Sequence, residues 1–367
     1  MVKRNTARDS NLELFRILTM LLIVAHHYVV NSGLTELIYQ VPSSMRALFL
    51  LLFGAWGKTG INCFLMITGY FMCKSSISAK KYAKLVLEVL FYRLVLNGIF
   101  WITNYNAFTW RGLLTVALPV TGIGLGFTEA YLVFFLCIPF LNILVSNMTQ
   151  RQHIYLLALL FFMYVLFGTI KQIFHITMNY VSWFAVIYLF ASYVRLYPNK
   201  YFENVRLWGW LTAAFLGLGA LSVVYCLRRG YGNAYYYVSD SNNFLALAIS
   251  FSAFLFFKNM KMRHSPVINR IAATCFGVLQ IHANSDAMRQ WLWKDVLQNT
   301  TVFPKNWMPV HAVCSVLAVF AVCAAIDCLR IRFLEEPFFK LWDRHWPQAA
   351  KKLKILENRI FKEQVNG

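Results

Sequence analysis

The first apolar stretch of the sequence, residues 12–33, carries one acidic residue, one arginine and two adjacent histidines. They are Glu13, Arg16, His26 and His27. A charged residue at the centre of a membrane helix costs about 2.5–3.5 kcal/mol on insertion scales, so each is a candidate functional residue. A neutral histidine in a water-poor cavity can act as a general base on a hydroxyl, or can accept an acyl group transiently. His27 is the candidate for either role.

The spacing of Arg16 and His27 places them on one face of a helix. At 100° per residue they lie roughly 20° apart around the axis, and at 1.5 Å per residue about 16 Å apart along it. Arg16 then lies near the cytoplasmic end, where it would hold an anionic group, and Glu13 is close enough to pair with it. Alternatively, Arg16 extends to the inner interface and the histidines only hydrogen-bond neighbouring helices. No His or Cys stands at the helical i+4 spacing, so no metal is predicted.

The composition is that of a polytopic membrane protein. Of the 367 residues, 59% are hydrophobic and only 14% are charged, which excludes an ordinary soluble domain. Hydropathy predicts an all-α protein with about ten transmembrane helices. These lie near residues 12–31, 48–72, 85–104, 127–146, 154–170, 181–196, 207–226, 244–257, 267–283 and 309–329.

The distribution of basic residues predicts that both termini are cytoplasmic. With the N-terminus inside, most of the 35 Lys and Arg residues fall in inner segments, as the positive-inside rule requires. The net charge of +20 is then a topology signal, and no nucleic-acid partner is predicted. The first span is about 20 residues long and no cleavage site follows it, so it is expected to be a retained helix rather than a signal peptide.

One membrane domain over residues 1–333 and a cytoplasmic tail over 334–367 are expected. The tail places Ala349, Leu353, Leu356 and Ile360 at helical spacing among lysines, which predicts an amphipathic helix on the membrane surface. The eight cysteines form no CxxC pair, so neither a disulfide framework nor a zinc site is indicated. The outer connection 228–243 is rich in Tyr, Asn and Ser, which suits either sugar binding or an interfacial aromatic belt.

Five blocks, in order along the chain, resemble the integral-membrane acyltransferase-3 family. The Arg-x10-His signature of that family falls on Arg16 and His27, and its Gly-x-Asn-x-Phe block begins at Gly60. The blocks are NLELFRILTMLLIVAHH (11–27), GKTGINCFLMITGYF (57–71), AYLVFFLCIPFLN (130–142), TCFGVLQIHANSDAMRQWLW (274–293) and IDCLRIRFLEEPFF (326–339).

The resemblance implies a membrane O-acyltransferase in the cytoplasmic membrane of a bacterium. Such a protein takes an acyl group, usually acetyl, from cytoplasmic acetyl-CoA or another acyl-CoA. It delivers that group to a hydroxyl of an extracytoplasmic glycan or lipid-linked glycan. No metal cofactor is expected, membrane lipids are the other expected partners, and the oligomeric state is not predicted.

The resemblance also suggests where the acyl donor binds. Coenzyme A carries several phosphates, so Lys80, Lys81 and Lys84, just before the third span, are candidate ligands, with Arg93 about two turns further in. Topology alone explains the lysines equally well. Glu88 could be the structural partner of Arg93.

The candidate acceptor-binding residues are Asn62, Tyr70, Glu129, His282 and Asn284. The sequence departs from the usual family pattern around two of them: GFTEAY puts Glu129 in an unexpected place, and GVLQIHAN lacks an expected Tyr and Asp near His282. Glu129 is either a second acid/base or an interfacial carboxylate.

Two functions from other classes compete with the acyltransferase. A proton-coupled secondary transporter could use the same intramembrane Arg, His and Glu residues, but no inverted repeat supports it. A catalytically idle anchor for an envelope-assembly complex would tolerate the loss of His27, which an enzyme would not.

Overall fold

Every regular element that the computed structural model describes is a helix. The description covers residues 9–119, 126–170 and 179–347, and no strand occurs within them. The helices are α1 Ser10–Val30, α2 Leu34–Gln40, α3 Met45–Gly54, α4 Gly57–Met72, α5 Ala79–Ile102, α6 Trp110–Ala117, α7 Phe127–Asn147, α8 Gln150–Leu160, α9 Phe167–Thr169, α10 Tyr180–Leu196, α11 Val205–Arg228, α12 Phe244–Asn259, α13 Pro266–Ala273, α14 Cys275–His282, α15 Asp286–Arg289, α16 Asn299–Val302 and α17 Met308–Arg330, with π-helical turns at Phe161–Leu166, Gln290–Val296 and Ile331–Glu335.

Seven helical stretches in these residues are long and apolar enough to cross a membrane. They are Ser10–Val30, Met45–Met72, Ala79–Ile102, Phe127–Asn147, Gln150–Thr169, Val205–Arg228 and Met308–Pro347. Helices α10 and α12 are shorter and apolar. The segment predicted to span at 267–283 is instead two short helices, α13 and α14, that meet at Thr274. The all-α prediction is therefore confirmed, while the count of about ten and the cytoplasmic termini stay predictions.

Many large apolar side chains are exposed on the surface of the molecule. Large side chains such as Ile102, Phe140 and Trp210 are 83%, 73% and 78% exposed. Many of these side chains lie on helices long enough to cross a membrane, as expected for a surface that faces lipid.

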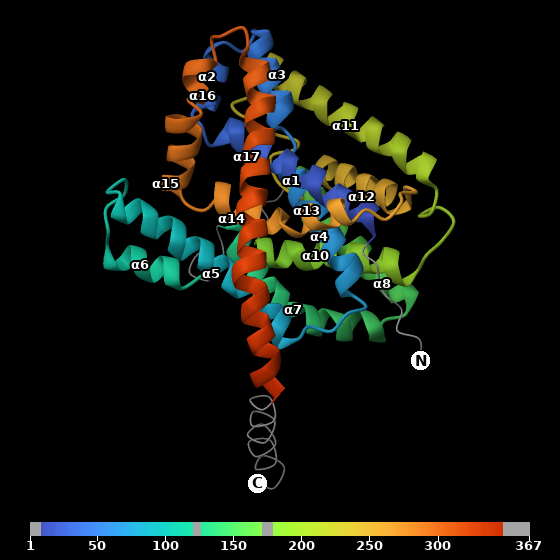
Figure 1. Cartoon of the computed structure of the whole chain (residues 1–367). Helices are drawn as coiled ribbons and strands as arrows, with labels where there is room; N and C mark the ends of the chain where they lie inside the picture. Colours follow the sequence, from blue (N-terminus) through green and yellow to red (C-terminus); the bar gives the residue numbers. More distant parts are fainter. Residues whose placement is uncertain (1–8, 120–125, 171–178, 348–367) are drawn as a thin grey trace.

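Helix α4 lies at the centre of the fold, packed against α1, α10 and α12 (Figure 1). Glycines allow the close approach of α1. A Cβ added at Gly57 would lie 2.2 Å from Cγ of His26, and one at Gly60 would lie 2.8 Å from Cγ1 of Ile23. Neither space admits a methyl group without moving α1. The glycines of the GKTGIN stretch therefore bring α4 against the histidine-bearing part of α1.

Helix α17 runs almost the full height of the molecule in Figure 1 and continues beyond Arg330. The helical run Met308–Pro347 passes through the boundary predicted at 333/334. Two acidic residues of this extension reach α5: Glu335 pairs with Lys84 at 2.5 Å and Asp343 with Lys80 at 2.7 Å. The amphipathic helix predicted at the end of the tail lies outside the described residues.

A buried ionic cluster joins α17 to α5. Arg330 pairs with Asp327 at 2.6 Å, as its spacing suggests, and also with Glu335 at 2.9 Å and Glu88 at 3.3 Å. All four side chains are 8% exposed or less. Buried carboxylates need a partner, and Arg330 supplies one to all three. The suggestion that Glu88 partners Arg93 is therefore wrong.

Candidate active site

The arrangement of His27 follows from a chain of hydrogen bonds that starts at a backbone carbonyl. The Nδ1 atom of His282 lies 2.6 Å from the carbonyl oxygen of Val278, one turn back on α14. Because a carbonyl can only accept, His282 carries its proton on Nδ1, and its neutral ring presents Nε2 as an acceptor. The Nδ1 atom of His27 lies 3.0 Å from that Nε2 and donates to it. Neutral His27 is thereby left with an unprotonated Nε2, which is what a general base requires.

His26 is held in a similar way by a backbone carbonyl of α3. Its Nδ1 lies 2.6 Å from the carbonyl oxygen of Gly54, at the end of α3, so its Nε2 also carries a lone pair. The two adjacent rings have centroids 5.8 Å apart. Adjacent residues point about 100° apart around a helix. Both histidines nevertheless line one cavity, because the start of α4 packs against His26.

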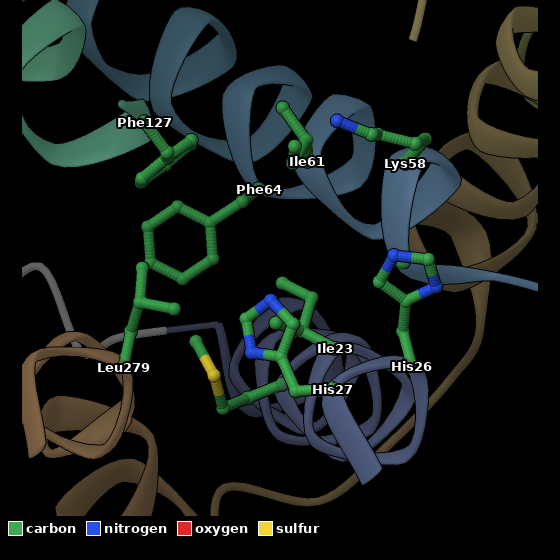
Figure 2. A pocket seen from close by; sticks show the side chains of 10 residues that line it. Ile23, His26, His27, Lys58, Ile61, Phe64, Phe127 and Leu279 are labelled. Carbon is green, nitrogen blue, oxygen red and sulfur yellow. The ribbon is translucent and has the colours of Figure 1, made fainter. Parts of the chain in front are cut away.

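The histidine cavity has a volume of about 90 Å3. Figure 2 shows the His26 and His27 rings on one side of it and Phe64, Ile61 and Lys58 of α4 on the other. Its lining is Met20, Ile23, His26, His27, Gly57, Lys58, Ile61, Phe64, Phe127 and Leu279. The lining is mostly apolar, and its ionisable groups are the imidazoles of His26 and His27 and the amine of Lys58. Electrostatic interactions are weakly screened in such a setting.

Lys58 is a site residue that the sequence analysis missed. Its Nζ donates to the hydroxyl of Tyr180 at 2.6 Å and lies 5.4 Å from the centre of that ring. A cation in the cavity that holds His27 can stabilise negative charge developing on a carbonyl oxygen. A lysine inside an apolar stretch, two residues before the Gly60 motif, was the available signal.

Arg16 lies in a second cavity, which we call the arginine cavity, of about 240 Å3. The predicted ion pair with Glu13 is present at 3.0 Å. The Nε atom of Arg16 is buried and has no hydrogen-bond partner among the described residues, so the guanidinium retains capacity for an anion. The cavity is lined by Arg16, Phe64, Thr68, Lys81, Lys84, Leu85, Glu88, Tyr131, Phe135 and Phe276.

The candidate donor ligands do not all meet at this cavity. Lys81 and Lys84 line it, while Lys80 points to Asp343 and to the Phe339 ring. Lys81 donates to Ser75 and Ser76, and Lys84 pairs with Glu335. Arg93 lies further along α5, where it pairs with Glu129 of α7.

The candidate acceptor-binding residues are dispersed. Asn62 is fully buried and hydrogen-bonds the Ser241 carbonyl at 2.7 Å and Trp183 at 2.9 Å, so it fastens the connection 228–243 and α10 to α4. Tyr70 lies near the other end of α4, where Arg195 donates to its hydroxyl at 2.7 Å. These two side chains are not brought to the histidine cavity.

The remaining acceptor candidates lie around the C-terminal part of α14. His282 contacts His27 directly. Asn284 accepts a hydrogen bond from Asn97 of α5 at 3.0 Å, and the Glu129 carboxylate belongs to the Arg93 pair. From the connection 228–243, the ring of Tyr235 approaches His26 to 6.3 Å, with a buried hydroxyl that has no partner among the described residues.

No metal centre is formed by the part of the chain that the structure describes. Within it, no three His, Cys, Asp or Glu side chains gather as a metal ion would require.

The fold and the site thus define a helical, multi-pass membrane protein, in which paired histidines line one cavity and a half-buried arginine lines the next. A family model described as an acyltransferase domain matches residues 9–328, and the chain belongs to this acyltransferase-3 family. Membership identifies it as a membrane acyltransferase and lends no support to the transporter alternative. No curated protein and no solved structure matches the chain.

Proposed function

We propose that this protein moves an acyl group, acetyl in the first instance, from cytoplasmic acyl-CoA to a hydroxyl of an extracytoplasmic glycan or lipid-linked glycan. The observation that carries the proposal is the hydrogen bond from His27 Nδ1 to His282, because it leaves Nε2 of His27 free for chemistry. Family membership supports acyl transfer as the reaction class.

In the proposed transfer, His27 takes one proton from the acceptor and returns it to the leaving group. The acceptor hydroxyl attacks the thioester carbonyl, a carbon–oxygen bond forms, and Nε2 of His27 takes the hydroxyl proton. The carbon–sulfur bond then breaks, and the departing thiolate receives that proton from His27. The amine of Lys58 would stabilise the carbonyl oxygen while it carries negative charge.

The arginine cavity is the proposed binding place for the anionic part of the donor. Arg16, Lys81 and Lys84 line it, and the unpartnered Nε of Arg16 fits a phosphate oxygen. Arg16 and His27 lie on one uninterrupted helix, α1, so a donor held at the arginine can extend along α1 towards the histidine. The proposed location is the cytoplasmic membrane of a bacterium.

The test is transfer of label from acetyl-labelled CoA to the envelope glycan fraction of membranes. Membranes carry the wild type, His27→Ala, His26→Ala or His153→Ala. His153 is a matched control because it is fully buried in α8, contacts the Leu189 carbonyl, and lines neither cavity. We expect the wild type and His153→Ala to label the glycan and folded His27→Ala to lose at least roughly 100-fold in rate.

Equal labelling by wild type and His27→Ala would remove His27 from the chemistry. A smaller loss in His27→Ala than in His26→Ala would move the base to His26. In the absence of acceptor, label that stays on wild-type protein but not on His27→Ala would assign a transient acyl-histidine in place of the general base.

A further inference from the structure

The two cavities follow one seam between α1 and α4. On each helix, four of the lining residues recur at positions i, i+4, i+7 and i+11, the spacing of a single helical face. They are Arg16, Met20, Ile23 and His27 on α1, and Gly57, Ile61, Phe64 and Thr68 on α4. The faces run in opposite directions, because Gly57 approaches His26 while Thr68 shares the arginine cavity with Arg16.

Phe64 is the one residue that lines both cavities in the described chain. Its side chain is buried, with 8% of the residue exposed. The centre of its ring lies 5.7 Å from the guanidinium carbon of Arg16 and 6.5 Å from the Phe127 ring, which meets it edge-on. Figure 2 shows the Phe64 ring across the histidine cavity from His27. The Phe64 ring therefore lies between the arginine cavity and the histidines.

The histidine cavity is small. Its volume of about 90 Å3 lies well below the roughly 300 Å3 at which ligand pockets for drug-sized molecules begin. Ile23, Ile61 and Leu279 form apolar walls, so an acyl chain can enter but has little room to extend. A longer chain would need the space that the Phe64 ring occupies.

We propose that Phe64 is the partition between the two cavities and the residue that limits the length of the acyl group delivered to His27. The inference rests on the proposed function, since it concerns the passage of the donor thioester from the arginine cavity to the histidine cavity. Truncating the ring would join the cavities and admit longer acyl groups. Enlarging the ring would obstruct passage while leaving the cationic groups in place.

The experiment measures transfer from acetyl-, butyryl- and octanoyl-CoA by membranes of wild type, Phe64→Ala, Phe64→Leu and Phe134→Leu. Phe134 is the control, because it is also buried but packs against Phe184 and Tyr188 and lines neither cavity. We expect Phe64→Ala to raise the butyryl-to-acetyl rate ratio at least roughly tenfold, with a smaller rise in Phe64→Leu. Phe134→Leu should leave the ratio unchanged.

A second variant keeps the test decisive if Phe64→Ala does not fold. Phe64→Trp should lower acetyl transfer while acyl-CoA still binds the membranes, because the added volume lies in the passage. An active wild type whose ratio is the same in folded Phe64→Leu, together with full activity in Phe64→Trp, overturns the role of Phe64 alone. A wild type that transfers no acyl group overturns the proposed function itself, and this inference with it.

Discussion

His27 on α1 and His282 on α14 are separated by 255 positions in the chain, yet their ring nitrogens lie 3.0 Å apart. The Val278 carbonyl, on α14 itself, sets the tautomer of His282, and His282 sets that of His27 only because α14 packs beside α1. The proposed role of His27 as the general base therefore depends on the packing of α14 beside α1.

Replacing His282 with alanine should lower kcat roughly 10- to 100-fold, because the partner that orients His27 is lost. The KM for acyl-CoA should not change, since His282 lines neither cavity. Steady-state kinetics at several acyl-CoA concentrations separates the two constants. A rise in KM at constant kcat would mean that His282 contacts the donor instead.

Replacing Lys81 or Lys84 with glutamine should raise the KM for acyl-CoA about tenfold, as expected when a charge-assisted hydrogen bond to a phosphate is lost. Lys80→Gln is the matched comparison, because Lys80 stands on the same turn but faces Asp343. Its KM should stay near the wild-type value. If all three variants shift KM equally, the lysines act through the general surface potential. Added salt should then abolish the difference in KM between the variants and the wild type.

Gly57→Ala should destabilise the protein by about 1–3 kcal/mol, because the new methyl group would overlap His26. Transfer activity should fall as well, since His26 shares the cavity of His27. Gly217→Ala in α11 is the control: no atom lies within 4 Å of its added Cβ, and alanine favours a helix. Thermal unfolding in detergent compares the two. Equal melting temperatures would show that α1 moves away from α4 without cost.

Arg330→Met should be strongly destabilising, by about 3–5 kcal/mol, because Glu88, Asp327 and Glu335 would lose their shared guanidinium partner in a buried site. Arg289→Met removes an arginine from an exposed pair, in which Asp286 is 97% exposed, and should change stability little. Detergent unfolding curves measure both. A mild effect at Arg330 would indicate that the three carboxylates are protonated or reached by water.

Features that depend on neighbours in the chain followed from the sequence. The apolar composition gives helices, since backbone groups in lipid must bond within their own segment. The placement of Arg16 and His27 on one helical face and the Glu13–Arg16 pair need only helical periodicity. The predicted pair is present where that periodicity put it.

Contacts between distant segments were decided by the tertiary structure. Whether His27 would meet His282, whether Arg93 would meet Glu129 or Glu88, and whether Lys58 would face the histidines all depend on how helices rotate and cross. That choice is made by close packing, as Gly57 and Gly60 show for the approach of α4 to α1, and a linear spacing rule carries no information about it. The sequence by itself thus determined the helices and their polar faces, and packing alone decided which faces meet.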